Sequence, residues 1–172
     1  SANSLLEREK VNVVIGGHCS TESLAIAPLI ERKGAIMMAA SSSSPKLTGA
    51  GDHVFRVTAP FTIGIDLMVP YLIQERKFRK MAVLYEETEY AEGIAEYLRK
   101  ELSAKGGSVP IFLSYKLGES DFLSLVTKIK SANVDGLYLS VQSPDSALLA
   151  LTKVAQLGLH LPLFGNEITG NS

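Results

Sequence analysis

The stretch VNVVIGGHCSTESLAIAPLIERKGAIMMAA (residues 11–40) shows the pattern that the rest of the chain repeats. An apolar run at 11–17 is followed by a helical segment at 21–33, and a second apolar run follows at 35–40. Continuous apolar runs are typical of parallel strands that are buried on both faces. Gly34 stands where a helix commonly takes its C-cap. The stretch therefore predicts a strand–helix–strand unit of a parallel α/β sheet.

The same alternation continues along the chain, which predicts an α/β fold throughout. Three further buried parallel strands are expected at 81–85, 135–141 and 161–165, another strand at 109–117, and a more exposed one at 53–59. Helices are expected at 3–10, 62–77, 90–104, 121–131 and 145–157. Pro70 lies inside one of these helices and should kink or break it.

Composition excludes several classes of protein. The 172 residues include 17 basic and 18 acidic ones without a basic cluster, so no nucleic-acid partner is expected. No apolar run reaches the roughly 18–20 residues that span a bilayer. The first residues lack the basic and apolar regions of a signal peptide, so either the protein is intracellular or a leader has been removed. The single cysteine, Cys19, is either a small buried hydrophobe or the partner of a cysteine outside this sequence.

Nothing in the sequence favours an enzyme. It contains no G-x-G-x-x-G, Walker A or G-x-S-x-G motif. The three histidines are scattered, and the adjacent side chains of His18 and Cys19 should diverge rather than form a catalytic dyad. Metal-ligand spacing is absent as well. We therefore expect no catalytic residue, no metal and no cofactor.

Polar residues follow every predicted parallel strand. Because ligands of open α/β sheets bind outside the carboxyl ends of the strands, these residues are the candidate site. Ser20 precedes a predicted helix, so its hydroxyl can cap the helix while free backbone N–H groups bind an anion such as a carboxylate. The serine run 41–44 can add hydroxyls to the same anion.

Two residues of the second half complement an anion site. Glu167 suits an ammonium group, and Tyr90 offers an apolar face and a phenol at a helix start. Together with the serines they describe a site for a zwitterion. Each of these residues also has an ordinary alternative: an N-cap for Ser20, a solvated loop for the serine run, a solvated carboxylate for Glu167, and packing against its own helix for Tyr90.

Several stretches together carry a resemblance to a known family. They are VNVVIGGHCSTESLAIAPLIERKG with its mid-helix Pro28, SSSSPKLTGAGDHVFRVTAP, MAVLYEETEYAEGIAEYLRKEL, and GESDFLSLVTKIKSANVDGLYLSVQSPDSALLALTKVAQLGL. In this order they resemble the type I periplasmic solute-binding proteins of ABC importers, specifically the leucine/isoleucine/valine-binding family. The resemblance implies two Rossmann-like parallel-sheet lobes around a cleft, with a crossover near Ala59–Pro60. It further implies an internal fragment, with a partial N-terminal lobe at 1–60 and a partial C-terminal lobe at 61–172.

The resemblance also assigns roles by matching positions. Ser20 would bind the α-carboxylate of the ligand, Ser41 and Ser43 would complete the carboxylate site, Tyr90 would contact the ligand from the other lobe, and Glu167 would pair with its ammonium group. Gln142 stands where the family often has an aromatic residue, which bears on the pocket for the ligand's side chain. The candidate ligand-binding residues are thus Ser20, Thr21, Ser41, Ser43, Tyr90, Gln142 and Glu167. In some family members the cysteine matching Cys19 forms a disulfide with an upstream cysteine.

The function implied is periplasmic or extracellular capture of an amino acid or similar small polar solute. The protein would deliver it to the membrane subunits of an ABC importer by cleft closure. The alternative is a ligand-sensing domain of a receptor or regulator with the same fold. An incomplete first lobe would leave a free sheet edge and exposed apolar surface, so the chain is also expected to self-associate.

Overall fold

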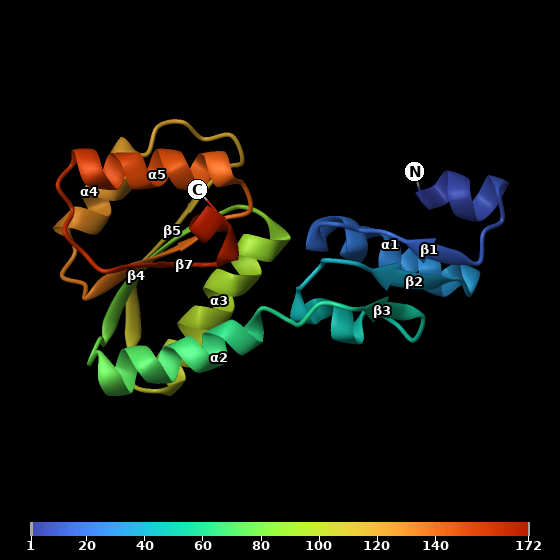
Figure 1. Ribbon diagram of the computed structural model, residues 1–172, viewed down its shortest axis with the longest axis horizontal. Helices are drawn as coiled ribbons and strands as arrows, with labels where there is room; N and C mark the ends of the chain where they lie inside the picture. The colour runs from blue at the N-terminus through green and yellow to red at the C-terminus, as the bar shows by residue number, and fades with distance from the viewer. Residues whose placement is uncertain (1, 172) are drawn as a thin grey trace. The chain divides into compact units, whose positions relative to one another are not determined.

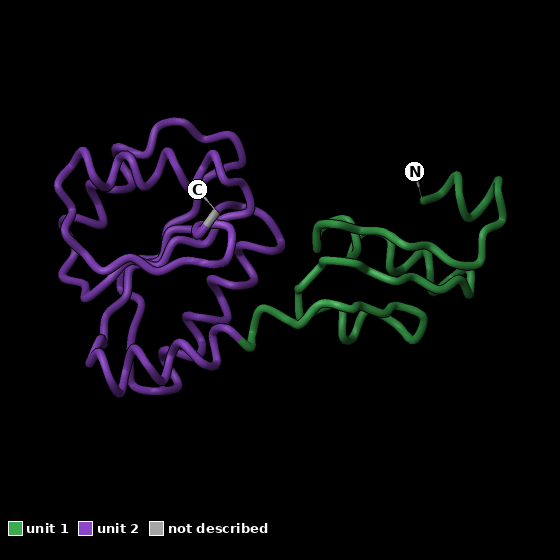
Figure 2. Tube along the Cα trace, in the orientation of Figure 1, with its two compact units in different colours: residues 1–63 green, residues 64–172 purple. Residues whose placement is uncertain are grey.

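The computed structural model describes residues 2–171, which form two compact units, residues 1–63 and residues 64–172 (Figure 2). Each unit is built on one sheet in which all paired strands run parallel. The α/β fold class is therefore confirmed. The assignment of 1–60 and 61–172 to the two lobes of a longer protein stays a prediction.

Unit 1 contains a three-stranded sheet in the order β1-β2-β3. Its strands are β1 (Val13–Ile15), β2 (Ile36–Ala39) and β3 (Val54–Arg56). Its helical segments are the π-helical turn η1 (Ser4–Arg8), α1 (Ser20–Lys33) and the 3-10 helix η2 (Pro45–Gly49). As expected, α1 ends at Gly34, whose φ of 61° lies in the left-handed region that glycine tolerates best.

The start of α1 differs from the prediction. Ser20 is the first helical residue, and Cys19 is the N-cap. The carboxylate of Glu22 accepts the backbone N–H groups of His18 at 3.1 Å and Cys19 at 3.2 Å. Glu22 thereby takes the place of the acidic residue in a capping box. The expectation that the Ser20 hydroxyl caps α1 was wrong, because that hydroxyl faces the serine loop instead.

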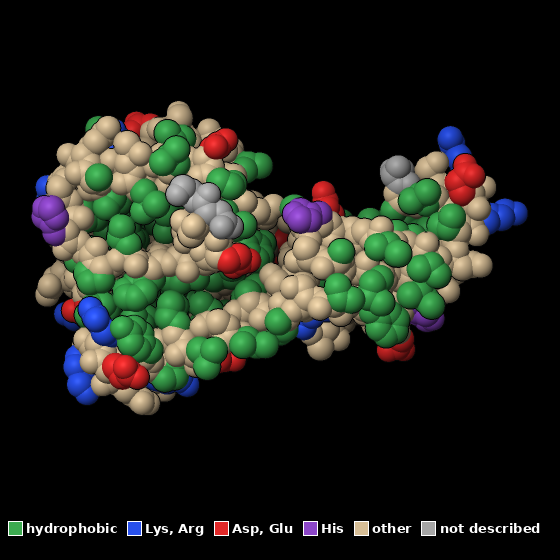
Figure 3. All heavy atoms as spheres, viewed as in Figure 1, with side chains coloured by type: hydrophobic (Ala, Val, Ile, Leu, Met, Phe, Trp, Pro, Cys, Tyr) green, Lys and Arg blue, Asp and Glu red, His purple; other side chains and the backbone are tan. Residues whose placement is uncertain are grey.

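Only one face of the unit 1 sheet is covered. Val14 and Met37 point toward α1 and are buried, whereas Val13, Ile15 and Ile36 on the opposite face are 55%, 78% and 41% exposed. Phe55 continues this exposed face on β3. Figure 3 shows hydrophobic side chains on the surface of this unit. The prediction that the runs 11–17 and 35–40 are buried on both sides was therefore wrong for the described chain. The apolar residues are present, but no second layer packs on them here.

Unit 2 contains a four-stranded sheet in the order β5-β4-β6-β7. Its strands are β4 (Lys80–Glu86), β5 (Ser108–Tyr115), β6 (Gly136–Ser140) and β7 (Leu163–Gly165). Its helices are α2 (Thr62–Pro70), η3 (Tyr71–Glu75), α3 (Glu89–Ala104), α4 (Leu123–Ser131), α5 (Pro144–Gln156) and η4 (Glu167–Asn171). Helices α2 and α3 lie on one face and α4 and α5 on the other (Figure 1). The central strands β4 and β6 are accordingly almost fully buried.

Pro70 changes the helix that contains it, as expected. The α-helical segment ends at Pro70 and continues as the π-helical segment η3. Proline has no N–H to give to the carbonyl four residues earlier, and its ring crowds that carbonyl. Here the chain continues in a wider π-type turn, a geometry that is rare in proteins.

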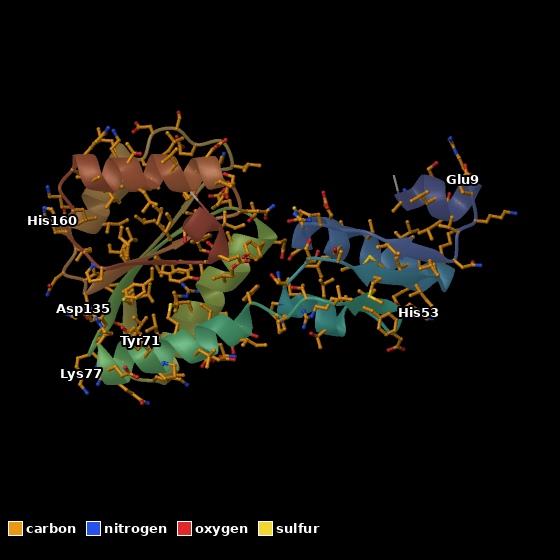
Figure 4. All side chains as sticks on the ribbon, viewed as in Figure 1. Glu9, His53, Tyr71, Lys77, Asp135 and His160 are labelled. Atoms are coloured by element: carbon orange, nitrogen blue, oxygen red, sulfur yellow. The ribbon has the colours of Figure 1, made fainter. Side chains whose placement is uncertain are left out.

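The amino ends of the two central strands of unit 2 are tied together by Asp135. Its carboxylate accepts the backbone N–H groups of Arg79 at 2.6 Å and Lys80 at 2.7 Å. The Asp135 N–H donates in turn to the Lys80 carbonyl at 2.7 Å. In Figure 4 Asp135 is labelled at this end of the sheet, near Lys77. The carboxyl ends of the same strands carry the candidate site.

Among residues 2–171, no helix is both long enough and apolar enough to cross a bilayer.

Candidate ligand-binding site

In unit 1 the serine loop is fastened to the start of α1 by two buried serines. The Ser42 hydroxyl lies 2.7 Å from the Ser23 hydroxyl and donates to the Gly17 carbonyl at 2.9 Å. The Ser44 N–H donates to the Ser20 hydroxyl at 3.3 Å. Ser42, Ser44 and Ser20 are each only 1% exposed. These three serines hold the loop in place, and Ser20 reaches it through its side chain.

The other two serines of the run are placed differently. Ser41 is exposed, and its hydroxyl lies 2.7 Å from Nδ1 of His18 and 2.8 Å from the His18 carbonyl. The Ser43 hydroxyl makes no hydrogen bond to any other described residue, while the Ser43 carbonyl accepts the Phe61 N–H at 3.1 Å. The hydroxyl of Ser43 therefore keeps its hydrogen-bonding capacity for another partner.

The arrangement in unit 1 can bind a carboxylate without a basic side chain. The α1 N-terminus contributes the N–H groups of its first turn, which have no partner within the helix. Thr21 is exposed in that turn. The dipole of α1 favours a negative charge at this end. The structure thus brings Ser20, Thr21, Ser41 and Ser43 to one end of unit 1, the carboxyl end of its strands.

In unit 2, Tyr90 and Glu167 meet although 77 residues separate them. Tyr90 is in the first turn of α3, which Thr88 caps by accepting the Ala91 N–H at 3.2 Å. The Tyr90 hydroxyl donates to the carboxylate of Glu167 and accepts from Nδ2 of Asn166 at 3.1 Å. Glu167 itself is exposed, so one face of its carboxylate is open to solvent.

Asn166 holds this pair in position. Its Nδ2 donates to the Val141 carbonyl at 2.7 Å, and its Oδ1 accepts the Val141 N–H at 3.3 Å. The side chain therefore extends the pairing of β7 with β6 by one step beyond Gly165. Asn166 directly follows the predicted strand 161–165, but nothing in the sequence indicated that its amide would pair with backbone.

The pKa values of two tyrosines, Tyr90 in this cluster and Tyr138 beside it, are raised strongly. Burial, followed by the hydrogen bond to Glu167, raises the pKa of Tyr90 well above its usual value of 10.0. Burial and the charge of Glu167 likewise raise the pKa of Tyr138. Both phenols stay protonated throughout the neutral range, so Tyr90 can act as a hydrogen-bond donor toward an anionic group.

Gln142 lies on the connection between β6 and α5, and its backbone is held by Glu86 at the end of β4. Its N–H donates to the carboxylate of Glu86 at 2.6 Å. Ser143, the N-cap of α5, donates to the same carboxylate through both its N–H and its hydroxyl. Glu86 is thus a second residue whose importance the sequence did not reveal, because its partners lie 56 or more residues away.

The described residues show no cluster of side chains typical of a metal site. No group of three or more histidine, cysteine, aspartate or glutamate side chains among residues 2–171 is placed to hold a metal ion. His53 and His160 belong to different units (Figure 4). The His53 ring is instead paired with Glu31 at 3.1 Å. Burial and the charge of Glu22 raise the pKa of the Cys19 thiol, which disfavours the reactive thiolate.

Comparison with known proteins identifies the family. The family model described as "Periplasmic binding protein" matches residues 1–172. The chain is 32% identical over 168 residues to the leucine-, isoleucine-, valine-, threonine- and alanine-binding protein of Pseudomonas aeruginosa, covering 94% of this chain and 43% of that protein.

Solved structures agree in fold. A leucine-binding protein from Thermotoga maritima superposes with a TM-score of 0.88 at 24% identity, covering 98% of this chain and 48% of that one. A solute-binding protein of an ABC transporter from Rhodopseudomonas palustris, solved with p-hydroxybenzoic acid, has a TM-score of 0.85 at 18% identity, covering 98% of this chain and 46% of that one.

The chain spans less than half the length of these relatives. The match nevertheless runs through both units, and the parallel sheets have the fold of type I periplasmic binding proteins. The resemblance seen in the sequence motifs is confirmed: this chain belongs to the periplasmic binding protein family.

Proposed function

We propose that the protein to which this chain belongs captures a small amino acid, of the branched-chain class, for an ABC importer. The capture is non-catalytic and takes place in the periplasm or outside the cell. The proposal rests on the family and on relatives whose names specify leucine, isoleucine and valine. Within the chain, the observation that carries it is the Tyr90–Glu167 pair at the carboxyl end of the unit 2 sheet.

The roles assigned to the residues follow from charge and hydrogen-bonding capacity. The exposed Glu167 carboxylate, oriented by Tyr90, pairs with the ammonium group of the ligand. The N–H groups in the first turn of α1 and the hydroxyls of Ser41 and Ser43 donate hydrogen bonds to the ligand's carboxylate. Gln142 contributes to the pocket for the ligand's side chain. A ligand that satisfies both charges is a zwitterion.

The direct test is isothermal titration calorimetry of the full-length protein against a panel of amino acids and 4-hydroxybenzoate. We expect binding of leucine, isoleucine or valine and no binding of the aromatic acid. The proposal is overturned if no amino acid binds while 4-hydroxybenzoate does, since that ligand has a carboxylate but no ammonium group.

A pair of variants tests the assignment of Glu167. Removing a charge-assisted hydrogen bond of about 1.5–3 kcal/mol should weaken binding of the amino acid roughly 10- to 100-fold in Glu167→Gln. The matched control is Glu75→Gln, which neutralises an exposed glutamate on η3 and should leave the affinity unchanged. Equal affinities of the wild type and Glu167→Gln would remove Glu167 from the site.

A further inference from the structure

Glu86 is the last residue of β4, and its side chain is fully buried. Four donors converge on its carboxyl group. Oε2 accepts the N–H groups of Gln142 at 2.6 Å and Ser143 at 2.9 Å. Oε1 accepts the hydroxyls of Ser143 at 3.1 Å and Ser146 at 3.2 Å. A group that accepts at both oxygens and donates at neither has the hydrogen-bond pattern of a carboxylate.

The donors belong to the connection that precedes α5, to its N-cap Ser143 and to its first turn. The first N–H groups of a helix have no partner within it, and a negative charge is favoured at this end. A buried carboxylate without donors would in turn be very unfavourable. Each side therefore depends on the other, and the connection between β6 and α5 is held to the end of β4.

The same contacts separate the two polar residues of this connection. The Ser143 hydroxyl donates to Glu86 and accepts the Ser146 N–H at 3.4 Å, so Ser143 is part of the helix cap. Gln142 donates its backbone N–H to Glu86. The preceding residue, Val141, is held independently by Asn166. The backbone of Gln142 is thus fixed on both sides.

We infer that Glu86 is a positioning residue for the ligand site. It fixes the backbone of Gln142, and so the direction in which the Gln142 side chain leaves the sheet, without touching the ligand. The ligand-binding part of this inference rests on the proposed function, because the role of Gln142 does. The fastening of the connection by Glu86 does not depend on any ligand.

A purely stabilising role makes a different prediction. If Glu86 only contributed to the stability of unit 2, its loss would speed amide exchange across the whole sheet through global unfolding. A positioning role confines the change to the connection, because local opening is then the route of exchange. Exchange rates at individual residues therefore distinguish the two.

The experiment is amide hydrogen exchange by NMR on this chain, in the wild type, Glu86→Ala, Glu86→Gln and Glu87→Ala. In Glu86→Ala the amides of Gln142 and Ser143 should exchange about tenfold faster or more, with those of β4 and β6 much less affected. Glu86→Gln keeps one acceptor oxygen and should show a smaller change at the same two amides. Glu87→Ala removes the adjacent, exposed carboxylate, which accepts from the Ser114 hydroxyl, and should change neither.

Unchanged exchange at both amides in Glu86→Ala overturns the inference, as does a uniform acceleration across unit 2. If Glu86→Ala does not fold, Glu86→Gln decides on the same criterion. In the full-length protein, affinity for whichever of leucine, isoleucine and valine binds most tightly should fall in Glu86→Gln and in Gln142→Ala. It should fall less than additively in the double variant, because both changes act through one side chain. Additive losses would refute the ligand part. Binding of 4-hydroxybenzoate by the wild type without binding of any amino acid would refute the proposed function and leave the exchange result standing.

Discussion

Replacing Asn166 by alanine should destabilise unit 2 selectively. The side chain is 8% exposed and makes two hydrogen bonds to the backbone of Val141 and one to the Tyr90 hydroxyl. Val141 is fully buried, so its N–H and carbonyl would lose partners in a place that water does not reach. At roughly 1–3 kcal/mol for leaving a buried polar group unsatisfied, and about 1 kcal/mol for an ordinary bond, the expected loss is about 2–4 kcal/mol.

The tyrosine content of the chain provides the assay. All six tyrosines lie in unit 2 and the chain has no tryptophan, so tyrosine fluorescence follows the unfolding of that unit alone. With a urea dependence of about 1–3 kcal/mol/M, a loss of about 2–4 kcal/mol in Asn166→Ala should lower the urea midpoint by roughly 0.7–4 M. Asn133→Ala, at an exposed position in the same unit, is the control and should leave the midpoint unchanged. A shift in Asn166→Ala no larger than that of the control would refute the role given to this side chain.

Three further predictions concern other parts of the chain. The chain should self-associate through the exposed face of the unit 1 sheet, so sedimentation should show Ile15→Lys as more monomeric than the wild type. Leu67→Lys, at a similarly exposed apolar residue of α2, should leave the association unchanged. A monomeric wild type would contradict this prediction. Hydrogen bonds from His53 lower the pKa of Glu31 below its usual value of 4.5, so Glu31 stabilises unit 1 above that pH and the contribution is lost as the pH falls through the lowered pKa. The difference in unfolding free energy between wild type and Glu31→Gln should therefore shrink from pH 5 to pH 3. A constant difference would argue against the pairing. The hydrogen bond to Asp66, followed by burial, raises the pKa of Tyr97 to about 12. Asp66→Asn should therefore absorb more at 295 nm than the wild type at pH 11, because more of the Tyr97 phenol is ionised. An unchanged spectrum would show that the bond is not formed in solution.

Much of the fold could be predicted because its signals are local. The apolar runs gave the parallel strands, and Gly34 ended α1 where a left-handed residue was expected. Pro70 marked the change from α- to π-helical geometry. The N-cap of α1 was missed because cysteine is an unusual cap, although the glutamate three residues later was visible in the sequence.

What the sequence could not show depends on distant partners. An apolar run indicates that a strand can be buried, but not that a covering layer is present. The sequence therefore predicted burial on both faces of β1 and β2, whereas the structure leaves one face exposed. The candidate residues do gather at the carboxyl ends of the strands within each unit, as topology requires. The contacts that orient them, from Asn166 to Val141 and from Glu86 to Gln142, join residues far apart in the chain and leave no periodic signal.

The Asp135 carboxylate restrains the amino end of the unit 2 sheet by accepting the backbone N–H groups of Arg79 and Lys80. These two charge-assisted hydrogen bonds hold the neighbouring strands β4 and β6 together at that end. At the far end, Glu86 and Asn166 hold the connections that follow the strands. The sheet is therefore restrained at both ends. Residues that would meet a ligand stand on backbone that is ordered before binding, which lowers the entropy that binding costs.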